Sequence, residues 1–399
     1  MAIYNIKESP LFKVENVSSA INEIVSKMQV GDQAYLPYGQ YQIQDTIHII
    51  NENELRYCHI DLYGEYEYCG NATAVIIEGE HLDFSLQRIT TNRRSDFYKT
   101  TPDDILPTGV EVRSCNYSRL DFDEIEGFEY GLKLSPNRDD TGICYTKFNF
   151  RYISYCYIPL FFGVPDDVVA WINENQFNGG RLKGYYGMVA RKGKRQIDEY
   201  NNNTFYNIAF EAIETNAIDW EFCTFNTIIS PRFESVMCKT ICESETCKSN
   251  KYRISVAIPF DSVDIQSKYT DLQAPLHTYW EHMIREIRTD SEGNKSYEFF
   301  KELCVTVENQ DTELPMNCKN LVIRAEKVPV TVKLHQISAF ENNMIRVVVQ
   351  ASAYPIRIVD HTGKTVYSSS HGENINTLFF ANGHWMRQKP ENLTAVFAG

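Results

Sequence analysis

The sequence predicts an all-β protein whose main part is a right-handed parallel β-helix, with an N-terminal capping helix and a β-rich C-terminal region. The first observation behind this prediction is a repeat, in which an apolar residue is followed by four residues of any type and then by a second apolar residue. The repeat occurs at Leu120/Ile125, Phe148/Ile153, Phe177/Leu182, Phe205/Phe210 and Ile228/Phe233. Its first members follow one another after 28, 29, 28 and 23 residues, a spacing typical of stacked structural units.

The content of these units indicates strands. A helical repeat would need two amphipathic helices per unit, whereas these units hold short apolar runs broken by Gly and Asn, such as Phe148 to Phe150 and Ile158 to Phe162. Asn175, Asn203 and Asn226 each stand two residues before the first apolar residue of a repeat, where stacked Asn side chains can satisfy backbone groups. Three short strands per turn therefore predict a parallel β-helix, and parallel crossovers are right-handed.

The N-terminal elements can be assigned in order. Apolar residues on one face predict a helix from Val17 to Met28, with Asn16 or Ser18 as its N-cap. Residues 34–49 then alternate as short strands around a Pro/Gly turn.

The C-terminal elements follow a different pattern. The repeat is lost after residue 250, and strand-like runs return after residue 320, with a hairpin through His361 to Lys364. We therefore expect three regions. Residues 1–50 hold the capping helix and first strands, 51–250 form the parallel β-helix, and 251–399 form a β-rich C-terminal domain.

Composition excludes several classes of protein. The 399 residues carry a net charge of -14, which argues against a nucleic-acid binder and against a protein of anionic membranes. With 43% hydrophobic residues the chain can bury a large core, which excludes global disorder. No stretch is apolar enough for a membrane helix, and the N-terminus is charged where a signal peptide is apolar. We expect synthesis in a cytosol without a signal peptide.

The eleven cysteines do not form a recognisable pattern. A disulfide framework is not expected in a long chain without a signal peptide. The tightest group, Cys238, Cys242 and Cys247, lacks the paired spacing of a zinc ribbon, so we expect free thiols rather than a metal site. Nucleotide-binding and nucleophile-elbow motifs are absent from the sequence, and we expect no cofactor.

Four stretches resemble a known superfamily. AYLPYGQYQIQDTIHI (34–49) and IDLYGEYEYCGNATAVII (60–77), after the predicted helix, resemble the start of pectate-lyase-like β-helices, in which a short helix plugs the open end of the solenoid. NNNTFYNIAFE (201–211) and FNTIISPRFE (225–234) resemble coils common in phage tailspikes. The resemblance covers residues 15 to about 250 and is specific for fold, because such coils occur in lyases, hydrolases and inert fibres alike.

The resemblance implies three classes of function. The first is a phage tailspike or tail-fibre protein of the virion that recognises a host surface polysaccharide and contacts other virion proteins. The second is a glycoside hydrolase or polysaccharide lyase on the same scaffold. The third is a purely structural virion component. A homotrimer is expected because 25 Tyr, 22 Phe and 4 Trp exceed what one narrow core encloses, so some should meet a partner.

Hydrolysis would rest on paired carboxylates. Glu211 and Glu234 each follow the Phe that ends a repeat, so they should stand on neighbouring coils about 4.8 Å apart. Two carboxyl groups this close suit retaining glycoside hydrolysis. Asp219 and Glu221 could add further acidic groups, and Trp220 between them an apolar face for a sugar ring. The alternative is a solvated ladder of like charges relieved by Arg232.

Lyase chemistry would need other groups. Arg181 and Lys183, with the cations of the segment 191–195, could neutralise a uronate, and Asp139-Asp140 or Asp166-Asp167 could bind calcium. The segment 191–195 also fits a solvated loop between coils.

Overall fold

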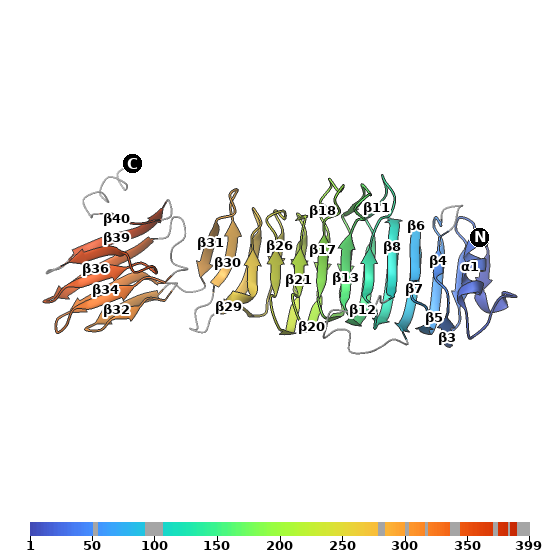
Figure 1. The fold of residues 1–399 in the computed structure, drawn as a ribbon, viewed down its shortest axis with the longest axis horizontal. Coiled ribbons are helices and arrows are strands. Elements are labelled where there is room, and N and C mark those ends of the chain that lie inside the picture. Colours follow the sequence, from blue (N-terminus) through green and yellow to red (C-terminus); the bar gives the residue numbers. More distant parts are fainter. Residues whose placement is uncertain are drawn as a thin grey trace. The chain divides into compact units, whose positions relative to one another are not determined.

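The computed structural model confirms the predicted fold class, a parallel β-helix of about 11 turns with one N-terminal α-helix (Figure 1). It describes residues 1–50, 55–91, 107–277, 284–299, 303–315, 318–335, 344–369, 374–381 and 384–388. The chain divides into two compact units, residues 1–273 and 274–399, and the β-helix forms the first. Within the described residues, no helix is long and apolar enough to cross a bilayer.

The first unit begins with an end cap built from β1 (Ile3–Asn5), the 3-10 helix η1 (Ile6–Glu8) and α1 (Ser18–Lys27). The buried face of α1 carries Ala20, Ile21, Ile24 and Val25, as the apolar spacing predicts. The N-cap is Val17, which has no capping side chain, and not Asn16 or Ser18 as expected; the side chain of Asn16, one residue earlier, accepts a hydrogen bond from the backbone N–H of Ser18 at 3.3 Å.

The cap also contacts the open edge of the solenoid. Asn22 of α1 donates to the carbonyl of Thr46 at 2.9 Å and accepts from the backbone N–H of His48 at 2.7 Å. Both partners lie at β4 (Ile47–Ile49), which pairs on its other side with β6 (Thr73–Glu80). One side chain thus stands in for the missing neighbouring strand.

Two long parallel sheets and a short third one run through the unit. The first, here sheet A, consists of β1, β2 (Gln33–Leu36), β3 (Gln40–Ile43), β5 (His59–Tyr68), β7 (Asp83–Thr91), β9 (Arg119–Glu126), β12 (Lys147–Cys156), β15 (Gln176–Asn178), β16 (Arg181–Gly184), β19 (Thr204–Tyr206), β20 (Ala209–Ile213), β23 (Thr227–Ile229), β24 (Arg232–Val236), β26 (Lys251–Arg253), β27 (Ile258–Pro259) and β29 (Asp271–His277). The second, sheet B, consists of β4, β6, β8 (Thr108–Asn116), β10 (Tyr130–Leu134), β11 (Gly142–Cys144), β13 (Ile158–Gly163), β14 (Trp171–Asn173), β17 (Met188–Arg191), β21 (Ile218–Trp220), β25 (Ile241–Glu243) and β28 (Val263–Ile265). The third pairs β18 (Tyr200–Asn201) with β22 (Cys223–Thr224), and the 3-10 helix η3 (Phe260–Ser262) precedes β28.

The predicted repeat is the core of this unit. Its first apolar residues form one column of register partners from Leu120 to Ile228, and its second apolar residues form another from Ile125 to Phe233. All these side chains are buried except that of Phe233, which is half-buried and stacks on Phe210. The expectation of full burial was therefore wrong for Phe233, whose strand β24 is largely exposed.

The predicted Asn ladder is confirmed and extends to Asn250. The Oδ1 atom of Asn203 accepts from the backbone N–H and the Nδ2 of Asn175 at 3.1 and 3.0 Å, and Asn226 and Asn250 continue the pattern. Each of these Asn follows a residue with positive φ at a turn, where the chain bends from one sheet to the next. The ladder satisfies backbone groups that the turns leave inside the solenoid.

Parallel pairing continues past residue 250. Tyr252 and Leu272 extend the first buried column, since β26 pairs with β23 and β29 pairs with β26. The sequence repeat is not evident here because its second position holds the small Ala257 after Tyr252 and His277 after Leu272.

The second unit is β-rich, as its sequence indicates. The strands β32 (Leu303–Glu308), β34 (Cys318–Ala325) and β36 (Met344–Ser352) pair in parallel, and so do β33 (Thr312–Glu313), β35 (Val330–Lys333) and β37 (Ile356–Val359). Antiparallel strands complete both sheets, namely β39 (Asn374–Ala381), β40 (His384–Gln388) and β38 (Thr365–Ser369). The antiparallel hairpin of β30 (Ile284–Thr289) and β31 (Lys295–Phe299) belongs to sheet A, since β30 pairs with β29. The predicted hairpin at His361 to Lys364 joins β37 to β38. Alternation between two parallel sheets makes a short two-sided solenoid with its own core.

Candidate functional site

A groove of about 690 Å³ crosses the outer face of sheet A where its coils bend. In one coil the bend lies between β15 and β16, at Gly179 and Gly180. A side chain at Gly180 would collide with the backbone carbonyl of Arg151 on the preceding coil, so glycine is required for this close approach. The groove is lined by Tyr63, Ser85, Leu86, Gln87, Asp121, Phe122, Asp123, Asn149, Phe150, Arg151, Asn178, Gly179 and Gly180.

Polar side chains form a continuous row across this groove. Asp61, Ser85, Asp121, Asn149 and Asn178 occupy the same register position on five consecutive coils, and we call them the groove ladder. Its members hold one another: Ser85 donates to Asp61, Asn149 donates to Asp121, and Asn178 donates to Asn149 at 2.8 Å. The side chains are therefore oriented before any ligand arrives.

An aromatic residue occupies the next register position at each end of the groove ladder. Tyr35 pairs with Asp61 at one end, and Tyr206 pairs with Asn178 at the other. Tyr63, which lines the groove, is 47% exposed.

Charged groups flank the groove ladder in pairs. The Arg119 guanidinium binds both carboxylate oxygens of Asp121, at 3.2 and 2.8 Å, and Arg151 lies 2.9 Å from Asp123. His59 lies 2.7 Å from Asp61 and 3.1 Å from Asp83. Partial burial alone would lower the pKa of His59, but hydrogen bonds and attraction to these two carboxylates outweigh it and raise the pKa.

Further along the same sheet, three carboxylates lie close to Arg88. It lies 3.2 Å from Glu124, 3.3 Å from Glu126 and 4.0 Å from Glu65. Burial raises the pKa of Glu124; Arg88 opposes this shift and Glu126 adds to it. Glu65 and Arg88 also line a second hollow of about 430 Å³ next to the end cap.

Glu211 and Glu234 are register partners on β20 and β24, as the sequence predicts. Each carboxylate has its own cation. Arg181 lies 3.2 Å from Glu211, and Arg232 lies 2.9 Å from Glu234. The sequence suggests that Arg232 relieves the repulsion between the two carboxylates. In the structure Arg232 pairs with one of them, Glu234.

Arg181 and Lys183 both project from β16 and contact aromatic rings of the neighbouring coil. The Arg181 guanidinium lies 5.6 Å from the ring centre of Tyr152, and the Lys183 ammonium lies 4.2 Å from that of Tyr155. Lys183 also donates to the Tyr155 hydroxyl at 3.1 Å.

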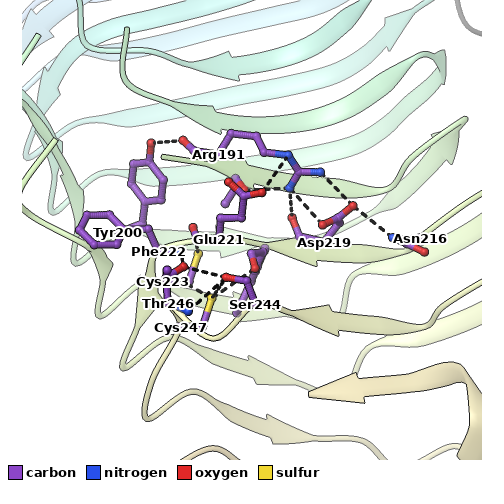
Figure 2. A network of polar contacts seen from close by, with 12 residues as sticks. Arg191, Tyr200, Asn216, Asp219, Glu221, Phe222, Cys223, Ser244, Thr246 and Cys247 are labelled. Atoms are coloured by element: carbon purple, nitrogen blue, oxygen red, sulfur yellow. Dashed lines mark hydrogen bonds and ion pairs between the residues drawn. The ribbon is translucent and has the colours of Figure 1, made fainter. Parts of the chain in front are cut away.

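Asp219 lies on β21 of sheet B and Glu221 directly follows this strand, so the structure does not bring them together with Glu211 and Glu234 on sheet A. Figure 2 shows Arg191 reaching over both acids, with bonds of 3.0 and 2.9 Å to Asp219 and an ion pair of 3.8 Å to Glu221. Asn216 holds Asp219 from the other side at 3.1 Å.

The expected role of Trp220 as a sugar platform is corrected by the structure. Its side chain is 2% exposed and packs near Phe205 and Tyr252 inside the solenoid. Strand alternation explains this, because Ile218 and Trp220 point inward on β21 while Asp219 points outward.

One acid of each pair considered as a calcium ligand forms an ion pair. Asp166 binds Lys194 at 2.6 Å, and Asp139 lies 3.5 Å from Arg195. Across the ranges that the structure describes, no group of three or more His, Cys, Asp or Glu side chains is arranged to hold a metal ion.

Sequence reasoning missed the groove ladder, although a signal was present. Asp121, Asn149 and Asn178 each directly follow the first apolar residue of a repeat. Since successive side chains of a strand point to opposite faces, these three had to lie together on the outside of neighbouring coils.

Comparison with known proteins was made by sequence and by structure. No family model and no curated protein matches the sequence. Among solved structures, DFA-IIIase from Arthrobacter chlorophenolicus A6 without its lid has 11% identity and a TM-score of 0.41, over 91% of this chain and 92% of that one. The AlgE6 A-module of the Azotobacter vinelandii mannuronan C-5 epimerase has 14% identity and a TM-score of 0.39, over 83% and 93%.

Proposed function

We propose that the chain binds an extended polysaccharide in the groove of sheet A. The observation that carries this proposal is the groove ladder, a row of polar side chains on five consecutive coils that are hydrogen-bonded within two groups, Asp61 with Ser85 and Asn149 with Asp121 and Asn178. Coils repeat about every 4.8 Å, so a polymer of hydroxyl-bearing rings lying along the row meets the same kind of partner at each step. The flanking tyrosines offer apolar ring faces beside polar groups, a combination suited to sugars.

Binding can be tested by removing two members of the groove ladder. The double variant Asn149→Ala/Asn178→Ala deletes amide groups that can bond to sugar hydroxyls. We expect at least tenfold weaker binding, about 1.4 kcal/mol, on a polysaccharide found by screening the wild type on a glycan array. Asn71→Ala, at an exposed position outside the groove lining, serves as the control. Unchanged affinity in the double variant would place the binding site elsewhere.

The biological setting that we propose is a phage tailspike or tail fibre of the virion that attaches to a host surface polysaccharide. The coils at residues 201–211 and 225–234 support it by their resemblance to tailspike coils. Adsorption of the purified protein to capsulated cells, and loss of adsorption after the capsule is removed, is the expected outcome.

Hydrolysis of the bound glycan is a second candidate, favoured by the register pairing of Glu211 and Glu234 on adjacent coils. If these groups act as acid/base and nucleophile, Glu211→Gln/Glu234→Gln should abolish release of reducing ends while the thermal midpoint stays nearly unchanged. Full activity in that variant would remove the pair from consideration. Release of unsaturated uronates would instead indicate a lyase.

A further inference from the structure

We propose that the groove selects an uncharged, hydroxyl-rich glycan over polyuronates and over cationic amino-sugar polymers. This inference rests on the proposed glycan binding and adds the chemical class of the ligand. It is carried by the way in which the charges around the groove ladder neutralise one another.

The charges of the groove ladder and its flanks balance. The acidic groups are Asp61, Asp83, Asp121 and Asp123, and the basic groups are His59 when protonated, Arg119, Lys147 and Arg151. Neither sign dominates the row, so the groove offers no net attraction to a polyanion or to a polycation.

The individual ion pairs also disfavour binding of a charged glycan. Arg119 is held by Asp121 and Arg151 by Asp123, while His59 lies between two carboxylates. A uronate that bound Arg119 or Arg151 would have to displace the carboxylate already there, and that carboxylate would then face the uronate as a like charge. Lys147 occupies the register position of Arg119 on the next coil and, like Arg119, His59 and Asp83, lies beside the groove lining rather than in it.

The next arginines beyond the bend are also paired with carboxylates. Arg88 is surrounded by Glu65, Glu124 and Glu126, and Arg181 is paired with Glu211. The arginines nearest the groove thus do not supply a row of cations at the coil spacing, which a polyuronate would require.

Hydroxyl groups fit this arrangement without disturbing it. A hydroxyl both donates and accepts, and a carboxylate in an ion pair still has lone pairs available, just as a guanidinium still has N–H groups. Asn149 and Asn178 add neutral amide groups in the same row. An uncharged sugar chain can therefore add hydrogen bonds while every internal ion pair stays intact.

The first test compares charge classes with the intact protein. The probes are neutral hexasaccharides (malto-, cello-, xylo-, manno- and inulo-), hexagalacturonate, hexamannuronate and chitosan hexaose, together with a microbial glycan array, measured by calorimetry at 0.15 M salt. We expect binding confined to uncharged glycans and nearly independent of salt. Preferential binding of a uronate or of chitosan would overturn the inference and leave glycan binding intact, whereas no binding to any glycan would overturn the proposed function and the inference with it.

The second test reverses the selectivity. Asp121→Asn/Asp123→Asn removes the carboxylate partners of Arg119 and Arg151, and we expect hexagalacturonate affinity to rise roughly tenfold and to become salt-dependent. The matched control Glu308→Gln removes the carboxylate that pairs with Arg324 at 2.7 Å in the second unit. It should leave uronate affinity unchanged. A wild type that binds hexagalacturonate as tightly as the double variant, with both showing the same circular dichroism and thermal midpoint, would contradict the inference.

Discussion

Glu243 is a carboxyl group fully buried inside the β-helix, and its surroundings are built around it. Its oxygens accept hydrogen bonds from Asn250 at 2.8 Å, Tyr252 at 2.5 Å, Thr270 at 3.0 Å and from Ser267. Burial raises the pKa of Glu243, although these four donors act in the opposite direction. No repeat or spacing in the sequence marks this residue, because its partners come from two later segments of the chain, residues 250–252 and 267–270.

The raised pKa of Glu243 predicts how the stability of the folded protein depends on pH. In the unfolded chain the carboxyl ionises first, so its contribution to stability is complete below the unfolded pKa and is lost as pH rises through the higher folded pKa. Glu243→Gln should remove this part of the pH dependence and change the free energy of unfolding by less than about 1.5 kcal/mol, since an amide can still bond to the four neighbours. Thermal unfolding of both proteins from pH 4 to pH 8 checks this.

The control for this prediction is Glu243→Ala. It removes an acceptor shared by four buried polar groups and should cost about 3 kcal/mol or more. Equal pH dependence in the wild type and Glu243→Gln would show that the carboxyl titrates alike in both states.

At the scale of elements, sequence reasoning succeeded where spacing along the chain determines contact. The columns that begin at Leu120 and Ile125, and the Asn ladder, follow directly from residues that recur about once per coil. Sequence reasoning failed to predict which outward-facing side chains line the groove, because that depends on the shape of the surface. Glu211 and the groove residue Asn149 are both outward polar residues of sheet A, and the sequence does not say which lies at the concave bend.

The Asn ladder supports an element-scale prediction. Asn203 accepts two hydrogen bonds from Asn175 and donates two, to the carbonyl of Ile172 at 3.0 Å and to Asn226 at 3.1 Å. Asn203→Ala leaves buried donors and a carbonyl unsatisfied and should lower the free energy of unfolding by about 2–4 kcal/mol. Chemical denaturation measures this.

Thr204→Ala, the next residue on the half-exposed outer side, is the matched control and should cost less than about 1 kcal/mol. If both variants lose the same stability, the ladder does not contribute beyond an ordinary strand residue.

At the scale of the whole molecule, the expected homotrimer is the prediction that depends least on local structure. It began from the large number of aromatic residues, and several exposed ones turn out to contact each other within the chain. Tyr57, His81, Tyr117 and Tyr145 stack in sequence on four successive turns, with ring centres 4.5, 5.2 and 4.9 Å apart. Aromatic content alone therefore overstates the surface left for a partner.

Light scattering decides the oligomeric state. Three chains of 46.2 kDa give a particle of about 139 kDa, and we expect this mass to persist on dilution if the chain is a tailspike-like trimer. A monomeric mass at high micromolar concentration would contradict the trimer and leave the binding proposal for the groove unaffected.

The end cap has a consequence for assembly. A parallel β-helix exposes unpaired backbone N–H and C=O groups at its first coil, and such an edge is a template on which a second chain can continue the stack. Asn22 occupies this edge by bonding to Thr46 and His48 of the first turns. The ten residues of α1 thus cover the edge of sheet B at β4, where a second chain could otherwise add a strand.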